Sequence, residues 1–203
     1  MIVIVDNRTG NLGSIKNILK RCGHGSIISS DADDILLAEK LILPGVGAFD
    51  AGMTNLSELG LVEALNKRVM EDKVPILGIC LGMQLMSQRS EEGKLPGLGW
   101  VNAQTIRFRK DELNGLRIPN MGWNAINLRK QHPLLSGLDA QSAFYFVHSY
   151  HVVFDNPEDI LATTEYGITF TSAFTHSNIM GTQFHPEKSL RWGIGVLNNF
   201  ANM

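Results

Sequence analysis

The stretch PILGICLGMQ (75–84) decides the fold, because it joins an apolar strand to a helix through a cysteine between two glycines. The apolar run ends at Ile79, and Gly78 and Gly82 flank Cys80 at equal spacing. A cysteine in an apolar strand is most often a small core residue. The order strand, Gly-x-Cys-x-Gly, helix instead predicts a sharp turn that projects the cysteine above a sheet.

The first half of the chain alternates apolar runs with segments of helical spacing. The short apolar runs lie at 2–5, 26–28, 40–45 and 74–80. The segments expected to be helical lie at 10–23, 52–72 and 81–89. Continuous apolar strands separated by helices predict a mostly parallel sheet covered on both faces, so we expect an α/β fold.

From about residue 98 the sequence changes to β-rich stretches divided by Gly, Pro, Asn and Asp, until a closing helical segment at 189–203. This pattern predicts hairpins or a mixed extension of the same sheet. The sequence shows no internal repeat, low-complexity tract or linker. We therefore expect a single domain over residues 1–203, with a mostly parallel central sheet flanked by helices and a β-rich second half.

Composition limits the class of protein. The chain has 44% hydrophobic and 19% charged residues and a formal net charge of −2, which gives no electrostatic footprint for nucleic acid. Its apolar runs are much shorter than the roughly 20 residues that span a bilayer. The two cysteines, Cys22 and Cys80, form no disulfide framework. We expect a reduced, cytoplasmic protein without a membrane segment.

A nucleophilic cysteine needs a base and a group that orients the base. In GTQFHPEKS (181–189), His185 and Glu187 are two residues apart, and Pro186 favours an extended backbone at His185. Side chains two apart in an extended chain point to the same side, so the carboxylate can orient the imidazole. Beside Cys80 this pattern predicts a Cys-His-Glu triad, although HPE alone is also typical of a solvated turn.

The segment LPGVGAFD (43–50) ends a predicted strand with Gly45 and Gly47 on either side of Val46. It is compatible with an ordinary turn between a strand and a helix. The functional interpretation is that the glycines let backbone amides approach a substrate carbonyl, and that these amides and the amide of Leu81 form an oxyanion hole. Both segments are expected at the carboxyl ends of parallel strands, where such folds bind ligands.

The motifs PGVGAF, GICLGMQ and FHPEKS, in this order and at these distances, resemble the class I (triad-type) glutamine amidotransferases over essentially the whole chain. Together with PNMGWN (119–124), FVHSY (146–150) and GNL near the start, they most resemble the glutaminase subunits of imidazole glycerol phosphate synthase, an enzyme of histidine biosynthesis. The combination is specific, whereas each motif alone is not.

The resemblance implies a flavodoxin-like fold and hydrolysis of L-glutamine to glutamate and ammonia, without a cofactor or a metal. Cys80 would attack the side-chain amide, His185 would transfer the proton, and Glu187 would hold the imidazole. Matching motif positions would bind the glutamine, namely Gly47, Gln84, His148, Ser149 and Tyr150.

The resemblance also implies a heterodimer. The ammonia would be channelled to a (β/α)₈-barrel cyclase that makes imidazole glycerol phosphate and an aminoimidazole carboxamide ribonucleotide. Matching positions for the interface are Gly10, Asn11, Met121, Trp123 and Lys188. Each has a structural alternative, since Asn11 is also suited to cap the first helix and Trp123 is also suited to a core.

Two residues depart from the family pattern. Asn7 replaces a usual aromatic residue, and His151 replaces a common tyrosine. Neither belongs to the proposed triad, but both bear on partner choice. The alternatives are therefore a paralogous glutaminase subunit that serves another synthase, such as one that amidates surface-polysaccharide sugars, a stand-alone γ-glutamyl cysteine hydrolase, or a non-catalytic binding subunit.

Overall fold

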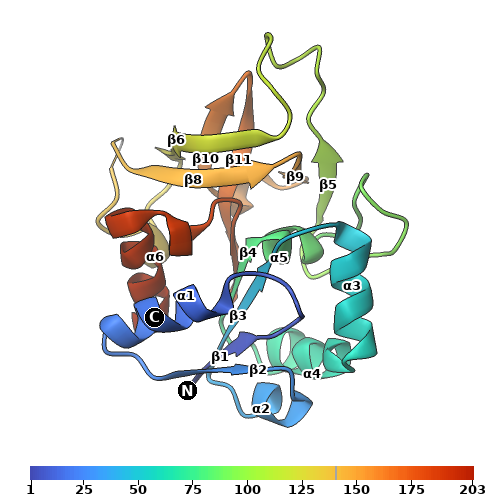
Figure 1. Cartoon of the computed structure of the whole chain (residues 1–203), viewed down its shortest axis with the longest axis vertical. Coiled ribbons are helices and arrows are strands. Elements are labelled where there is room, and N and C mark those ends of the chain that lie inside the picture. Colours follow the sequence, from blue (N-terminus) through green and yellow to red (C-terminus); the bar gives the residue numbers. More distant parts are fainter. Residues whose placement is uncertain (140) are drawn as a thin grey trace.

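A computed structural model describes residues 1–139 and 141–203 of the chain. Its central feature is an eight-stranded sheet with the strand order β2-β1-β3-β4-β12-β11-β10-β7 (Figure 1). The strands of this sheet are β1 (Ile2–Val5), β2 (Ser26–Ser29), β3 (Lys40–Gly45), β4 (Ile76–Cys80), β7 (Asn127–Leu128), β10 (Ile160–Tyr166), β11 (Ile168–His176) and β12 (Ile179–Thr182).

The sheet is parallel on one side and antiparallel on the other. Strands β2, β1, β3, β4 and β12 run parallel, whereas β11, β10 and β7 are added antiparallel. The predicted α/β class and the mixed extension of the sheet by the second half are both confirmed. The last parallel strand, β12, returns from the second half to pair with β4.

Helices cover both faces of the sheet (Figure 1). They are α1 (Leu12–Arg21), α2 (Ala32–Leu36), α3 (Phe49–Glu58), α4 (Leu61–Asn66), α5 (Leu81–Leu85) and α6 (Leu190–Asn202). Alternate residues of one strand serve the two faces: in β1, Ile2 and Ile4 join the core beneath α1 and α6, and Val3 and Val5 join the core beneath the other helices. This explains why the parallel strands read as continuous apolar runs.

Two separate strand pairs complete the fold. They are β5 (Ala103–Arg107) with β9 (Tyr150–Phe154), and β6 (Asn120–Ala125) with β8 (Ala143–His148), both antiparallel. Figure 1 shows β6 and β8 side by side in front of β10 and β11, in the half of the molecule away from α2. Ser149 alone separates β8 from β9, so the chain passes from one pair to the other beside the carboxyl end of β4.

The helix expected over 81–89 is shorter than predicted, because α5 ends at Leu85. The Ser87 hydroxyl donates to the Gln84 carbonyl at 2.7 Å, and the Gln88 amide donates to the Ala103 carbonyl at 3.0 Å. These bonds draw the chain away from helical pairing and toward β5. The helix expected over 52–72 is likewise divided at Gly60, whose φ of +67° starts α4 in a new direction.

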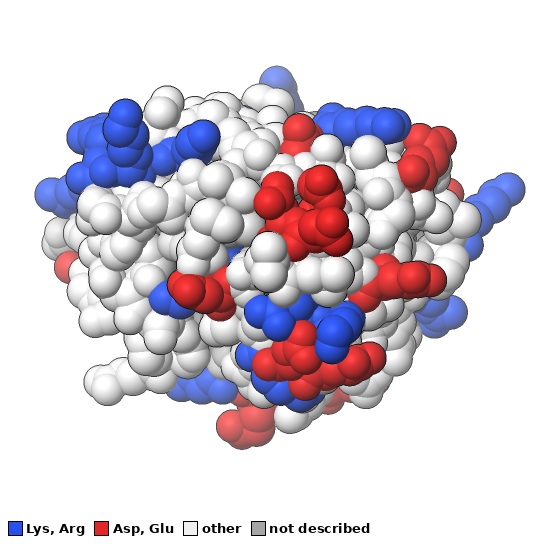
Figure 2. All heavy atoms as spheres, turned by 90° about the horizontal axis from the view of Figure 1, so that it is seen from below, with Lys and Arg blue, Asp and Glu red and all other residues white. Residues whose placement is uncertain are grey.

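Charged groups of both signs are mixed on the end of the molecule that carries α2 and α4 (Figure 2). Arg68 and Asp72 pair there at 2.7 Å, and Lys67 and Glu71 lie 3.8 Å apart. Solvent screens ion pairs at a protein surface, so these pairs contribute little to stability. Among the described residues, no helix has the length and apolar character needed to cross a membrane.

The turn between β4 and α5 depends on close backbone approach at two glycines. A Cβ atom at Gly82 would lie 1.8 Å from the Leu43 carbonyl oxygen of the neighbouring strand. A Cβ atom at Gly78 would lie 2.8 Å from the backbone nitrogen of Met83. Because backbone atoms cannot move aside like a flexible side chain, glycine is required at both positions. The steric reason expected for the Gly-x-Cys-x-Gly pattern is confirmed.

We predict that Gly82→Ala lowers the free energy of unfolding by about 4 kcal/mol or more, because its methyl group overlaps the Leu43 carbonyl. The matched control is Gly13→Ala in α1, where a Cβ atom has nothing within 4 Å. That change should leave stability unchanged or raise it by up to about 1 kcal/mol. Urea unfolding measures both, and similar stabilities for the two variants would contradict the steric argument.

Candidate active site

Cys80, His185 and Glu187 come together at the carboxyl edge of the sheet. Strands β4 and β12 are parallel neighbours with Ile79 beside Thr182, so the residues that follow each strand emerge at the same edge. Nδ1 of His185 donates to Oε1 of Glu187 at 2.8 Å, and both side chains are buried. The topology therefore brings the cysteine and the histidine of the predicted triad together although they are far apart in the sequence.

Cys80 has an unusual backbone conformation, with φ of 53° and ψ of −107°. Non-glycine residues with positive φ are uncommon, and such strain is concentrated at functional sites. The cysteine is the last residue of β4 and immediately precedes α5. Its strained turn places the thiol on the wall of a cavity even though the residue is only 6% exposed.

The environment of His185 favours its protonated form. Burial by itself lowers the pKa of His185, but interaction with Cys80 and the hydrogen bond from His185 to Glu187, together with the negative charges of both partners, raises it to about 9. Nε2 makes no well-aligned hydrogen bond among the described residues, so Cys80 acts on this pKa through proximity and charge. A proton on the imidazole beside Cys80 stabilises a thiolate there.

The backbone after the histidine differs from the prediction. His185 itself is extended, but the extended chain expected through Glu187 is wrong, because Pro186–Lys188 forms a 3₁₀ turn that His185 begins. The Ser189 hydroxyl donates to the His185 carbonyl, and the Lys188 amide also donates to that carbonyl at 3.1 Å. The turn brings Glu187 back toward the imidazole, so the predicted His-Glu contact forms by a different route.

The cavity beside Cys80 has a volume of about 350 Å³ and unites most of the predicted site residues. Its lining comprises Val46, Gly47, Cys80, Leu81, Gln84, Glu92, Pro119, Val147, His148, Ser149 and Tyr150. Gly45 does not line the cavity but lies beside Cys80 in the β3–β4 pairing. The residues proposed for an oxyanion hole therefore lie at two neighbouring strand ends, beside Cys80.

Glu92, Pro119 and Val147 also line the cavity, but no pattern in the sequence points to them. Glu92 lies in the irregular segment after α5, and its Oε2 accepts a hydrogen bond from the Phe49 amide at 2.9 Å. That bond holds the carboxylate at the start of α3. Glu92 thus adds a negative charge to a cavity for which only neutral polar groups were predicted.

A buried polar network supports the cavity wall. Nε2 of Gln84 donates to the Tyr150 carbonyl and to Oε1 of Gln183, both at 3.1 Å. Nδ1 of His148 donates to the same carbonyl at 2.8 Å, and Asn120 donates to Nε2 of His148 at 3.2 Å. Burial lowers the pKa of His148 to about 3, which keeps the ring neutral. Both ring nitrogens of His148 are thus occupied, and Gln84 lines the cavity with its Nε2 held by Tyr150 and Gln183.

The residues predicted for a partner interface occupy different environments. Asn11 is the N-cap of α1, and its Oδ1 accepts from the Ser14 amide at 3.4 Å, so its capping role is confirmed. Gly10 has a φ of +93° and packs against Gly45. Trp123 is 50% exposed and is not a core residue, and Met121, two residues before it on β6, is 62% exposed.

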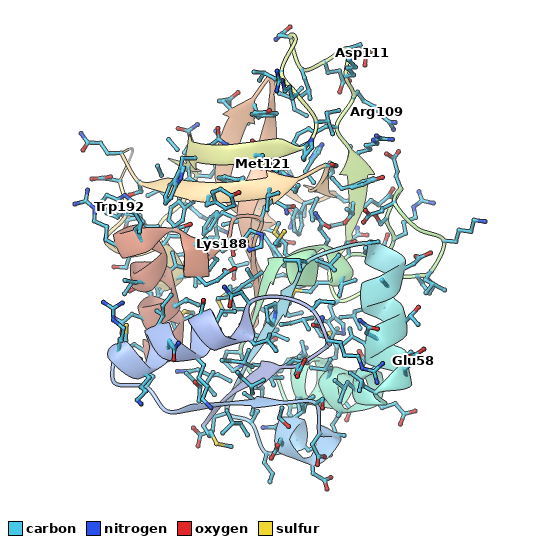
Figure 3. All side chains as sticks on the ribbon, in the orientation of Figure 1. Glu58, Arg109, Asp111, Met121, Lys188 and Trp192 are labelled. Carbon is cyan, nitrogen blue, oxygen red and sulfur yellow. The ribbon has the colours of Figure 1, made fainter. Side chains whose placement is uncertain are left out.

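Three of these residues, Met121, Trp123 and Lys188, form with Tyr145 what we call the β6–β8 patch. Tyr145 contacts both Trp123 and Lys188: its ring centroid lies 6.2 Å from that of Trp123 and 5.6 Å from Nζ of Lys188. Figure 3 labels Met121 on β6 and Lys188 below β8, on the side of β8 toward α1. Because Lys188 directly follows Glu187, the patch adjoins the triad.

The sequence matches the family model for "Glutamine amidotransferase class-I" over residues 3–202. The chain belongs to the class-I glutamine amidotransferase family. It is 52% identical to "Imidazole glycerol phosphate synthase subunit HisH 2" of Methanococcus maripaludis, with 98% of each chain covered. It is 48% identical to the protein of the same name in Pseudomonas aeruginosa, with 100% of each chain covered.

Solved structures support the amidotransferase fold. A protein titled "Crystal structure of glutamine amidotransferase" aligns with a TM-score of 0.73 at 20% identity, with 100% of each chain covered. A glutamine amidotransferase from Thermotoga maritima aligns with a TM-score of 0.64 at 16% identity, covering 92% of this chain and 75% of that one. At these identities the structures establish the fold class alone.

His151, one of the two departures from the family pattern, is buried in β9 against Phe108 and Phe170, with ring centroids 4.8 and 6.1 Å away. Its Nδ1 has no hydrogen-bond partner among the described residues. Burial lowers the pKa of His151 to about 4, against the opposing charge of Glu91. The other departure, Asn7, is buried and donates to the Pro44 carbonyl at 3.2 Å.

We predict that His151→Phe makes this amidotransferase more resistant to acid. The unfolded chain binds a proton at His151 below about pH 6.5, whereas the folded chain does so only near 4, so this group reduces stability as the pH falls between those values. The free energy of unfolding of the variant, relative to that of the parent, should therefore rise by about 1.4 kcal/mol for each unit by which the pH falls within that window. Urea unfolding at several pH values measures the difference, and the value near pH 8 isolates packing effects. A difference independent of pH would contradict the assignment.

Proposed function

We propose that this chain is the glutaminase subunit of an imidazole glycerol phosphate synthase and hydrolyses L-glutamine to glutamate and ammonia. The observation that carries the proposal is the buried arrangement of Cys80, His185 and Glu187 beside a cavity of about 350 Å³. The relatives at 48% and 52% identity over the full chain support the same conclusion. The whole chain, residues 1–203, acts as one amidotransferase domain.

In this reaction the Cys80 sulfur attacks the side-chain amide carbon of glutamine and forms a tetrahedral intermediate. His185 holds the proton that the thiol has lost and delivers it to the leaving nitrogen, which departs as ammonia. A γ-glutamyl thioester remains on Cys80. Water, deprotonated by His185, then attacks the thioester and releases glutamate and the free thiol. Glu187 orients the imidazole throughout and stabilises its positive charge.

Backbone amides stabilise the negative oxygen of the intermediate. The proposed donors are the amides of Leu81, directly after the nucleophile, and of Gly45, Val46 and Gly47 across from it. The pairing of Gly45 with Cys80 in adjacent strands supports this assignment, as does the position of Val46 and Gly47 on the cavity wall. Gly47 has a φ of +101°, a conformation that favours glycine.

The charged end of glutamine carries an ammonium group and a carboxylate. We assign recognition of this end to Oε1 of Gln84, the Glu92 carboxylate and the polar groups of Ser149 and Tyr150, all of which line the cavity. His148 contributes through its main chain and through the support that its ring gives to the Tyr150 carbonyl. A cavity of about 350 Å³ with these polar groups in its wall has room for an amino acid and the means to orient it.

Ammonia released into water is protonated and lost to a synthesis that needs a nucleophile, so the proposed function includes a partner. We propose a (β/α)₈-barrel cyclase, bound through the β6–β8 patch with Gly10 and Asn11 nearby. Exposed aromatic and thioether side chains are typical of interface anchors. The patch adjoins the triad through Lys188, which gives the partner a short path to the released ammonia.

We predict that the purified chain, mixed with a histidine-pathway cyclase and its ribonucleotide ligand, releases glutamate from L-glutamine, and that Cys80→Ser reduces this to background. Without the sulfur nucleophile no thioester forms. Coupled glutamate dehydrogenase measures the rate, with and without the cyclase. Activity that depends on Cys80 but does not change when this cyclase is added would support the glutaminase reaction and indicate that the partner is another synthase. Turnover of γ-glutamyl compounds but not of glutamine would indicate a stand-alone hydrolase.

We predict that Trp123→Ala weakens binding of the cyclase by about 30-fold, the effect of losing a central aromatic anchor. The matched control is Leu37→Ala, because Leu37 is 74% exposed and lies at the end of α2, opposite β6 in Figure 1. Isothermal titration calorimetry measures both affinities. Equal affinities for the two variants would show that the β6–β8 patch is not part of the interface with the cyclase.

A further inference from the structure

Gln183 is a buried amide that the proposed reaction does not use. It directly follows β12 and is 0% exposed. Its Nε2 donates to Sγ of Cys80 at 3.7 Å, and its Oε1 accepts from Nε2 of Gln84 at 3.1 Å. One side chain therefore touches both the candidate nucleophile and a residue of the cavity wall.

The direction of these hydrogen bonds is fixed by a backbone carbonyl. The Tyr150 oxygen can only accept, so the Gln84 group that faces it at 3.1 Å must be the amide nitrogen. That nitrogen also faces Gln183, which must therefore present its oxygen to Gln84. The nitrogen of Gln183 is left facing Cys80, and a flipped amide would set two donors against each other.

The backbone of Gln183 is held as firmly as its side chain. Its amide donates to the Ser172 carbonyl of β11 at 2.9 Å, and the preceding Thr182 lies beside Ile79 in the β12–β4 pairing. The charged groups around the sulfur are His185 and, behind it, Glu187. The Glu92 carboxylate lines the same cavity, as does the neutral ring of His148. Gln183 is thus a neutral donor in a buried setting, where a hydrogen bond to an anion is strong.

We propose that Gln183 is a positioning residue that holds the Cys80 sulfur in its anionic, attacking state and ties it to Gln84 on the cavity wall. The proposal rests on the proposed function only in taking Cys80 as the nucleophile. Gln183 supplies an N–H bond to the sulfur that does not depend on the proton carried by His185. Through Oε1 it also fixes the Gln84 amide, so that Oε1 of Gln84 stays turned toward the bound amino acid.

Two variants separate these roles. Gln183→Glu keeps the length of the side chain and an oxygen for Gln84, but replaces the donor to Cys80 with a carboxylate oxygen. Gln183→Met keeps the length and removes both hydrogen bonds. Thr182→Val is the matched control, because the neighbouring Thr182 is equally buried and its hydroxyl donates to the Phe184 carbonyl at 3.2 Å. Circular dichroism and thermal unfolding confirm that each variant is folded.

The test is the rate at which iodoacetamide alkylates Cys80 as a function of pH, with peptide mass spectrometry to separate Cys80 from Cys22. We expect the pH of half-maximal rate to rise by about one unit in Gln183→Met, which is about tenfold slower alkylation below that pH. Gln183→Glu should shift further, and Thr182→Val should match the parent. Unchanged pH profiles in both Gln183 variants would overturn the proposal. If Gln183→Glu does not fold, the pH profile of Gln183→Met alone tests the proposal.

Alkylation needs neither glutamine nor a partner, so its outcome is independent of the proposed glutaminase activity. In the glutaminase assay, we expect Gln183→Glu to lower kcat with little change in KM, because Gln84 keeps its acceptor. Gln183→Met should lower kcat and also raise KM. An identical loss in both variants, confined to KM, would overturn the link to the sulfur and leave only a packing role.

Discussion

The structure depends on the close backbone approach between α5 and β3, where the Leu43 carbonyl leaves no room for a side chain at Gly82. This contact fixes the turn at Cys80 and forces its backbone into a positive φ. Because β4 lies between β3 and β12, the same turn sets the distance from the sulfur to the loop after β3 and to His185 after β12. Three segments far apart in the sequence thus meet at one edge of the sheet.

A second constraint is the direction of the buried hydrogen bonds. The Tyr150 carbonyl accepts from both Gln84 and His148, and this sets the orientation of every amide that follows it. Buried polar groups are costly when a partner is missing, so a network anchored on one carbonyl resists rearrangement. The rigidity of the cavity wall therefore comes from polar contacts, whereas the position of the wall comes from the apolar packing of the sheet.

The sequence contained the parts of the site that depend on local geometry. Glycine spacing around Cys80 and the two-residue separation of His185 and Glu187 reflect contacts between near neighbours in the chain, so both could be predicted. Gln183 and Glu92 could not, because their contacts join segments distant in sequence and leave no periodic pattern. The end of α5 at Leu85 was missed for a similar reason, since it is set by pairing of the following residues with the β5 strand.

The two histidines near the sulfur illustrate how partners decide function within one fold. Burial lowers the pKa of both, but His185 also faces Cys80 and Glu187, and its pKa rises to about 9. His148 has a carbonyl and an amide as partners, and its pKa falls to about 3. At neutral pH, His185 therefore carries a proton and His148 does not. Because the pKa values of the two imidazoles are so far apart, proton transfer is assigned to His185, which is held by a carboxylate. Support of the cavity wall is assigned to His148.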